Sequence, residues 1–263
     1  MNIFKTVLKN LIPPFLFKII KKVFKIKKKY TFISKFKSIK EMERNHKYIL
    51  EYIDDDLEKK KSQTFLKPKF IHFENKYSCV PILVSLLKDN ISILEYGGGD
   101  NPVYSYIKNT TVKNIYSVVI EKKSFVKKFS NKIPDEFKEE ISYIDDVDNV
   151  SENKFDIIFF GSSIQYSKDH ERLLSKMFKF DAKYIIISRT FFNFLDDDFF
   201  VIQNNIPNNT FPYKMINFEN FVKFMERNRY NLIFNATLKS EHKHENITEI
   251  SYKDLIFKKN IEL

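Results

Sequence analysis

The sequence predicts a doubly wound α/β fold built on a mostly parallel sheet. Short apolar segments rich in β-branched and aromatic residues recur after residue 90, and helical segments alternate with them. These strands are apolar on both faces, which is typical of a parallel sheet covered by helices on both sides. Three of the four glycines stand together directly after the first strand, where such sheets bind ligands.

The predicted strands and helices follow one another in a regular order. Five strands are expected within segments 92–100, 115–121, 141–146, 155–163 and 184–190, with helices at 103–108, 124–133 and 171–178. A helix at 218–228 then leads to strands within 231–238 and 249–259, joined by a polar loop at 242–246. We expect the two late strands to form a hairpin that supplies an antiparallel edge strand.

The chain before the first strand divides into two parts. Residues 1–38 form a basic amphipathic segment, because lysines recur at helical spacing among apolar residues over 15–26. Two partners suit such a helix, an anionic lipid surface or the protein's own domain. Lysines interrupt its apolar runs, so it does not span a bilayer. Residues 39–90 are predicted to form a helical cap, with helices at 39–61 and 77–87, and residues 91–263 to form the main domain.

Composition and charge exclude several classes of protein. With 43% hydrophobic and 30% charged residues, the 263-residue chain is neither disordered nor a multispanning membrane protein. The net charge is +11, but residues 1–40 hold 12 Lys and no acidic residue, which leaves −1 for the rest. A broad basic groove for nucleic acid is therefore not expected. Cys79 is the single cysteine, which indicates a reducing, cytoplasmic location. If residues 1–38 bind lipid, the protein would lie on the inner face of the membrane.

The glycines Gly97–Gly99 lie at the turn from the first strand into a helix. Glycine adopts positive φ angles and allows the backbone to approach a ligand closely. Asn101 tolerates left-handed geometry, and Pro102 suits the first position of a helix. Pro102 replaces the third glycine of a dinucleotide fingerprint, and Glu95 precedes the loop, so a diphosphate ligand is disfavoured. A carboxylate there favours a ligand with an amino group and a net positive charge, such as S-adenosylmethionine.

Acidic residues also end the next two strands. Glu121 ends the second strand, where a carboxylate can hold both ribose hydroxyls. Asp145 or Asp146 follows the third strand, within reach of an adenine. An ordinary tight turn is the alternative for a lone glycine triplet, but acidic residues at three successive strand ends favour a cofactor site. The predicted cofactor-binding residues are Glu95, Tyr96, Gly97, Gly98, Gly99, Asn101, Glu121, Asp145, Gly161, Ser162 and Ser163.

Six segments, in this order, carry a family resemblance: EYGGGDN, YSVVIEK, GSSIQYSKD, ISRTFF, VIQNNIP and FPYKMI. They resemble the S-adenosylmethionine-dependent methyltransferases found among bacterial surface-polysaccharide and capsule biosynthesis genes. The likeness covers residues 45–260, and LIPPFLFKII near the start is similar to that family's N-terminus. It departs at Ser188, where the family has Asp, at Phe191, where it has Pro, and at Glu121, one position later than the family's glutamate.

The resemblance implies a class I, Rossmann-like methyltransferase fold with an N-terminal helical extension. S-adenosylmethionine would be the cofactor, S-adenosylhomocysteine its product, and a glycan precursor the methyl acceptor. By resemblance, Gln165 and Tyr166 at the end of the fourth strand shape the pocket; ordinary packing is the alternative for Tyr166. A hydroxyl acceptor must lose a proton, and Asp169 or His170 are candidates for the base. A structural or surface role is the alternative for His170.

Arg189 ends the fifth strand, where a planar donor fork suits a phosphate or carboxylate on the acceptor. A salt bridge to the following segment or to Asp196–Asp198 is the alternative. Residues 190–216 are expected to be a lid or substrate loop, because connections of this length usually bind ligands. The acidic runs at 54–56 and 196–198 are expected to be solvated charges, and no metal site is predicted. The candidate substrate contacts are Tyr77, Phe192, Gln203, Pro207, Phe211, Pro212 and Tyr213.

The sequence therefore predicts an S-adenosylmethionine-dependent O-methyltransferase. Its acceptor would be a sugar or phosphoryl-type group of a small, phosphorylated or nucleotide-linked precursor of a surface polysaccharide. In-line alignment of acceptor, methyl and sulfur would supply most of the rate. One rival is a membrane-associated scaffold that binds the cofactor without turnover, suggested by the basic helix and the lack of a clear base. The other is a nucleic-acid methyltransferase, suggested only by the N-terminal lysines.

Overall fold

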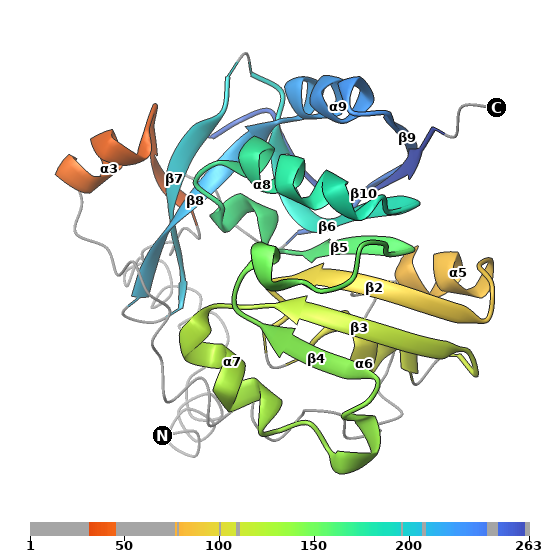
Figure 1. Cartoon of the computed structure of the whole chain (residues 1–263). Helices are drawn as coiled ribbons and strands as arrows, with labels where there is room; N and C mark the ends of the chain where they lie inside the picture. Colours follow the sequence, from red (N-terminus) through yellow and green to blue (C-terminus); the bar gives the residue numbers. More distant parts are fainter. Residues whose placement is uncertain are drawn as a thin grey trace, which may run out of the picture.

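The computed structural model describes residues 32–45, 77, 79–99, 101–108, 111–195, 197–206, 209–240 and 247–260. The predicted amphipathic helix at 15–26, the acidic run at 54–56, Asp196, Pro207 and the loop at 242–246 lie outside these residues. Figure 1 shows one twisted sheet with helices packed against it.

Five parallel strands form the centre of the sheet. In spatial order they are β4 (Ile141–Ile144), β3 (Asn114–Ile120), β2 (Asn90–Tyr96), β5 (Ile157–Gly161) and β6 (Tyr184–Asn193). Next to β6 lies β10 (Ile250–Lys259), which is antiparallel to it, and β9 (Tyr230–Thr237) pairs antiparallel with β10 at the edge. The doubly wound α/β fold and its late antiparallel edge strand are thereby confirmed.

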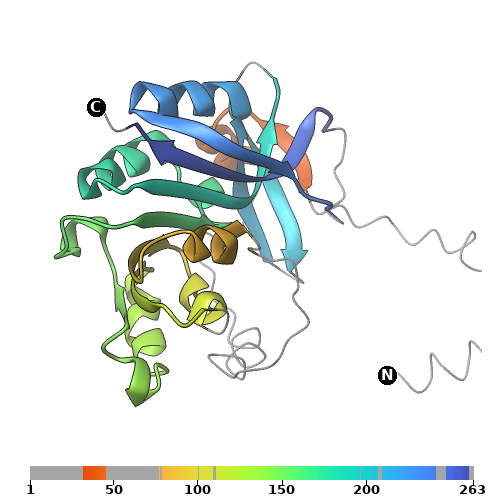
Figure 2. The same ribbon diagram turned by 90° about the vertical axis from the view of Figure 1, so that its right-hand side faces the viewer.

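Helices cover both faces of this sheet (Figures 1 and 2). On one face α5 (Cys79–Ser85), α6 (Val103–Lys108) and α7 (Lys123–Ser130) pack against one apolar core. On the other, α8 (His170–Met177) and α9 (Phe218–Arg227) pack against a second core. Short 3₁₀ turns η1–η4 occupy Asp135–Phe137, Val147–Asn149, Ile164–Tyr166 and Phe178–Phe180. The two cores explain why the strands are apolar on both faces.

The segment 190–216, predicted to be a lid loop, instead extends the sheet. It begins with the end of β6 and continues as a hairpin of β7 (Phe199–Ile206) and β8 (Asn209–Asn217), and β8 pairs with β6. The physical reason is that successive side chains of β7 point to opposite faces of the strand. Phe199 and Val201 enter one small core, and Ile202 enters another on the opposite face. Ladder hydrogen bonds and these two cores hold the hairpin in place.

The end of the predicted N-terminal segment is also a strand. β1 (Phe32–Phe36) pairs antiparallel with β7, and α3 (Ile39–Asn45) follows it. Phe32 packs edge-on against Phe191 and lies beside the ring of Tyr213. The boundary predicted at residue 38 is therefore wrong, because apolar residues of 32–36 belong to the core of the main domain.

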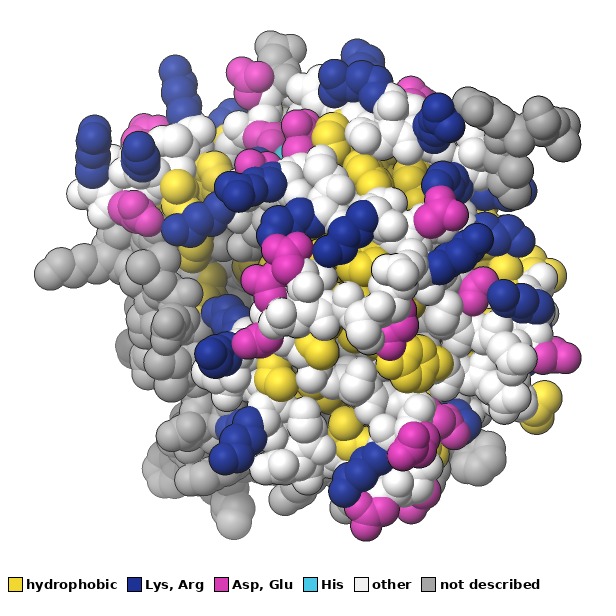
Figure 3. Space-filling model, viewed as in Figure 1, with side chains coloured by type: hydrophobic (Ala, Val, Ile, Leu, Met, Phe, Trp, Pro, Cys, Tyr) yellow, Lys and Arg dark blue, Asp and Glu magenta, His cyan; other side chains and the backbone are white. Residues whose placement is uncertain are grey.

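Charges on the face shown in Figure 3 are mixed, with Lys and Arg interspersed with Asp and Glu. This agrees with the near-neutral charge of residues 41–263 expected from the sequence. None of the helices in the described ranges is long and apolar enough to cross a membrane.

Candidate active site

The glycine turn lies where β2 ends and α6 is about to begin, at the carboxyl edge of the sheet. Gly97 and Gly99 have φ angles of +73° and +61°, which disfavour a side chain. A Cβ on Gly98 would lie 2.8 Å from both Glu95 Cδ and Val119 Cγ1, whereas one on Gly99 would meet nothing within 4 Å. Gly98 is therefore required by packing, and Gly99 faces open space.

Glu95 is buried and joins the glycine turn to α6. Its Oε2 accepts a hydrogen bond from the backbone N–H of Val103 at 2.8 Å. Asn101 is bonded to the hydroxyls of Ser105 and Tyr106. Glu95 is the residue predicted to bind the amino group of the cofactor. One of its carboxylate oxygens already orients α6, so Glu95 fixes the shape of the turn whatever else it binds.

The ends of β3 and β4 hold the same turn from the other side. Glu121 accepts hydrogen bonds from the backbone N–H of Gly99 at 3.0 Å and of Lys122 at 2.9 Å. Tyr143, which sequence reasoning missed, donates to the carbonyl of Gly99 at 3.0 Å. Its inward position in the third predicted strand was the available signal. Glu121 and the glycine turn are therefore in contact, as a shared cofactor site requires.

The predicted adenine-side residues lie close by but have local structural partners. Asp145 accepts from the Asn149 amide, and Asp146 caps η2 through the N–H of Asp148. Burial raises the pKa of Tyr96, and the charges of Glu121 and Asp146 raise it further. These contacts fix the turn after β4.

The end of β5 brings a buried hydroxyl to the glycine turn. The hydroxyl of Ser163 has no hydrogen-bond partner among the described residues, and Ser163 Cβ would lie 2.8 Å from a Cβ on Gly97. Buried polar atoms are almost always satisfied, so an orphaned one beside a glycine turn indicates a ligand position. Ser162 has a φ of +58° and donates its N–H to the carbonyl of Ser188, which joins β5 to β6.

Gln165 and Tyr166 connect this strand end to β6 and to the β7–β8 hairpin. Gln165 is buried and bonds Ser162 and Thr190 at 3.2 Å each. Tyr166 is half exposed and donates to Gln203 Oε1 at 2.7 Å, with its ring edge-on to Tyr213. Their position supports a role in shaping the site.

Two of the predicted substrate contacts are core residues in this structure. Phe192 is fully buried and packs against Phe218 and Phe221 of α9. Tyr213 is buried too, and its hydroxyl accepts the N–H of Phe191. The prediction that Phe192 contacts substrate is therefore corrected, because its side chain points into the core.

Arg189 lies within β6, one residue beyond Ser188, which pairs with Gly161 at the end of β5. Its Nε donates to the Tyr252 hydroxyl at 2.9 Å, and its guanidinium lies 5.8 Å from the ring centre of Tyr77. The Tyr77 hydroxyl in turn is 3.1 Å from where a Cβ on Gly161 would stand. The structure thus brings Tyr77 and Arg189 together beside the end of β5. Among the described residues Arg189 forms no salt bridge to Asp197 or Asp198, which was the alternative.

The candidate bases Asp169 and His170 have structural contacts. Asp169 caps α8, because its Oδ1 accepts the N–H of Arg172 at 2.9 Å. His170 is buried, and its Nδ1 lies 3.1 Å from the Lys214 ammonium, which can only donate. Burial and Lys214 lower the pKa of His170 to about 4, although Asp198 opposes this. His170 is neutral at pH 7.

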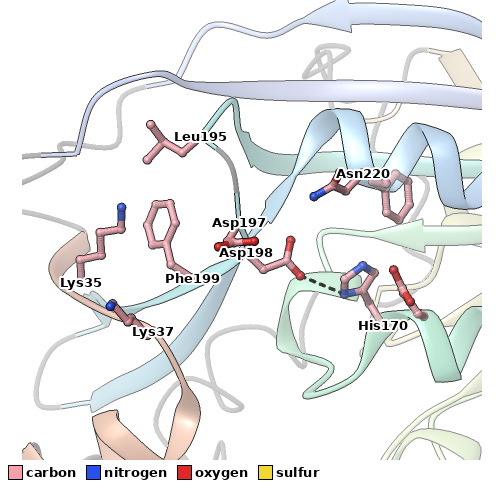
Figure 4. Close-up of a pocket in the computed structure, with 10 residues that line it drawn as sticks. Lys35, Lys37, His170, Leu195, Asp197, Asp198, Phe199 and Asn220 are labelled. Carbon is pink, nitrogen blue, oxygen red and sulfur yellow. Dashed lines mark ion pairs between the residues drawn. The ribbon is translucent and has the colours of Figure 1, made fainter.

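His170 also lines a hollow of about 740 Å³ between β1, the start of β7 and the first turns of α8 and α9 (Figure 4). Lys35 and Lys37 stand on the wall opposite His170, and Asp198 lies between. The glycine turn does not line this hollow. His170 therefore faces a hollow that Gly97–Gly99 do not line.

Asp169→Ala is expected to destabilise the protein by about 1 kcal/mol, because α8 loses its N-cap. Asp169→Asn keeps a capping oxygen and is expected to be nearly neutral. Urea unfolding measures both, and S-adenosylhomocysteine affinity should not change. Loss of activity in Asp169→Asn at unchanged stability would instead show a catalytic carboxylate.

No group of three or more His, Cys, Asp or Glu side chains in the described part of the chain is arranged to hold a metal. The first strand of the parallel sheet ends in a glycine turn that an acidic residue of the next strand clasps, at the edge where doubly wound sheets bind their ligands.

Comparison with solved structures makes this class more specific. The chain is similar to magnesium protoporphyrin IX methyltransferase from Synechocystis PCC 6803, with TM-score 0.53, 8% identity, and coverage of 78% of this chain and 95% of that one. It is also similar to a SAM-dependent methyltransferase from Methanosarcina mazei, with TM-score 0.51, 13% identity, and coverage of 69% and 98%. No protein-family model and no curated protein matches the sequence. The fold is that of the class I SAM-dependent methyltransferases.

Proposed function

We propose that this protein is an S-adenosylmethionine-dependent methyltransferase that methylates an oxygen of a small acceptor. The observation that carries the proposal is the glycine turn between the acidic end of β2 and α6, clasped by Glu121 through the N–H of Gly99. The neighbour from Synechocystis has S-adenosylhomocysteine bound, and this chain shares its fold.

The residues present fit such a cofactor. Gly99 leaves open space where a side chain would stand, and the buried Ser163 hydroxyl beside Gly97 has no hydrogen-bond partner in the described part of the chain. Gly97–Gly99, Ser163 and Glu121 would hold it, with Tyr96 and Asp145 nearby. When bound, it would supply an activated methyl group.

The chain's own residues would position the acceptor. The Gln165 contacts to Ser162 and Thr190 fix the ends of β5 and β6 relative to each other. Tyr166 ties the β7–β8 hairpin to the same place through Gln203. Such alignment contributes most where the leaving group is already activated. Asp169 and His170 are engaged elsewhere, so neither is assigned as the base.

We propose a sugar or phosphoryl-type group of a bacterial capsule or surface-polysaccharide precursor as the acceptor. This rests on the family resemblance of the strand-end segments. The second candidate is a scaffold that binds the cofactor without turnover, at a membrane if residues 1–38 bind lipid. The structural engagement of both candidate bases favours it. Methyl transfer from radiolabelled cofactor to any extracted glycan precursor would decide for the enzyme.

Glu121→Ala is expected to weaken S-adenosylhomocysteine binding about 10- to 100-fold, because one charged hydrogen-bonding group contributes about 1.5–3 kcal/mol. Calorimetry on the full chain measures the affinity. Glu139→Ala, at an exposed position, is the matched control and should bind normally. A wild-type chain that does not bind S-adenosylhomocysteine would overturn the proposed function.

A further inference from the structure

Arg189 is a partly buried cation without a carboxylate partner in the described part of the chain. Its hydrogen bonds within the described residues use the backbone N–H and Nε, and its two terminal nitrogens bond to no described residue. Burial would lower the pKa of Arg189, yet contacts with Tyr252 and Tyr77 raise it overall, so the charge is retained. Charges removed from water are normally paired. A guanidinium presented in this way is suited to an anion from outside the chain.

The geometry of Arg189 is imposed by a β-bulge. The β6–β10 register passes from Thr190 opposite Lys253 to Ile187 opposite Leu255, so Ser188 and Arg189 together face Asp254 alone. Bulges of this kind re-aim a side chain. Arg189 accordingly has a φ of +56°, in the left-handed region.

Asp254 holds this bulge. It is 2% exposed, and its Oδ1 accepts both the Ser188 hydroxyl at 2.7 Å and the Arg189 N–H at 2.8 Å. Tyr252, two residues earlier on the same strand, accepts from Arg189 Nε. One residue of β10 thus fixes the backbone of Arg189 and another fixes its side chain. Two contacts on a single arginine leave its terminal nitrogens little freedom of direction.

The other groups around Arg189 leave room for an added negative charge. Burial raises the pKa values of Tyr77 and Tyr252, so both phenols stay neutral at physiological pH. The planar fork of a guanidinium matches two oxygens of a phosphate or carboxylate.

We propose that the terminal nitrogens of Arg189 bind an oxyanion, a phosphate or carboxylate carried by the methyl acceptor, and that Tyr252 and Asp254 are its positioning residues. That the anion belongs to a methyl acceptor rests on the proposed function. The anion site itself does not depend on it. The site lies within β6, just beyond the last residue of β6 that pairs with β5, and the end of β5 leads to Ser163, which lies next to Gly97.

Arginine-selective ¹⁵N labelling of the full chain tests the site, because the sequence has only five arginines. Inorganic phosphate is titrated at constant ionic strength against chloride, and Arg189→Lys assigns the Arg189 signals. We expect saturable shifts at Arg189 and only weak, linear shifts at the other four arginines, which are all exposed. Linear shifts of equal size at all five would show simple screening and overturn the site.

The positioning role is tested on the same signals. Tyr252→Phe and Asp254→Ala, which remove the acceptors of the Arg189 Nε and backbone N–H bonds, should each weaken phosphate binding about three- to tenfold, the effect of one lost hydrogen bond. Tyr116→Phe, which removes a tyrosine hydrogen bond to Glu152, is the matched control and should not change it. Unchanged affinity in both β10 variants, with normal melting, would remove Tyr252 and Asp254 from the proposal.

Addition of S-adenosylhomocysteine separates the two sources of the anion. If the anion comes from the acceptor, phosphate still saturates Arg189 when the cofactor product is bound. If the product displaces phosphate and shifts the Arg189 signals itself, the anion is the cofactor's carboxylate and the acceptor assignment is overturned. If the product does not bind while phosphate still saturates, the proposed function fails and the anion site stands.

Discussion

Gly98→Val is expected to lower S-adenosylhomocysteine affinity at least 100-fold. A Cβ at this position would lie 2.8 Å from Glu95 Cδ and from Val119 Cγ1, and both neighbours are buried. Neither can retreat without moving β3 or breaking the bond from Val103 N–H to Glu95, so the turn itself must shift. Overpacking of this kind costs about 1–3 kcal/mol, and calorimetry with a parallel thermal melt measures both effects.

Gly99→Ala is the matched control for Gly98→Val. Its Cβ meets no atom within 4 Å, but its φ of +61° strains any side chain, at roughly 1–2 kcal/mol. Gly99→Ala should therefore lower the free energy of unfolding without displacing Glu95 or Val119. Any loss of S-adenosylhomocysteine affinity in this variant would show that the ligand occupies the open space beside Glu121. Normal binding in Gly98→Val would contradict a cofactor at the glycine turn.

The parts of the fold that depend on local pattern could be predicted from the sequence. The helix predicted at 103–108 matches α6 (Val103–Lys108), and the five apolar segments each overlap a strand. The reason is that both faces of these strands are buried, so each segment is continuously apolar and the polar residues mark its end. The contact between Glu121 and Gly99 followed for the same reason, because parallel strands end at one edge.

Parts that depend on distant pairing could not be predicted. β1 pairs with β7 by placing Phe32 opposite Gln203, whereas the length of segment 190–216 indicated a loop. Phe192 was assigned to substrate as part of the predicted lid 190–216, but its side chain packs against Phe218 and Phe221 of α9. Tyr252 and Asp254 were not found because their role arises only when β10 pairs with β6, although their spacing of two does place them on one face.

Acidification from pH 7 to pH 4 is expected to remove about 3 kcal/mol of folding free energy through His170 alone. Burial and the Lys214 ammonium lower its pKa from 6.5 to about 4 in the folded chain. Between these values the unfolded chain binds a proton that the folded chain does not. The contribution of His170 to the free energy of unfolding is therefore fully present above pH 6.5 and falls as the pH decreases towards 4.

His170→Gln isolates this contribution, because glutamine does not titrate while other acid-sensitive groups remain. Urea unfolding at pH 7 and pH 4.5 should show a larger loss for the wild type than for the variant. Lys214→Met should shrink the difference, since removing the ammonium raises the pKa of His170 while Asp198 still favours its protonation. A ¹³C-detected titration of the His170 ring gives the pKa directly. A value near 6.5 would mean that water enters the hollow freely and that the ring is not desolvated there.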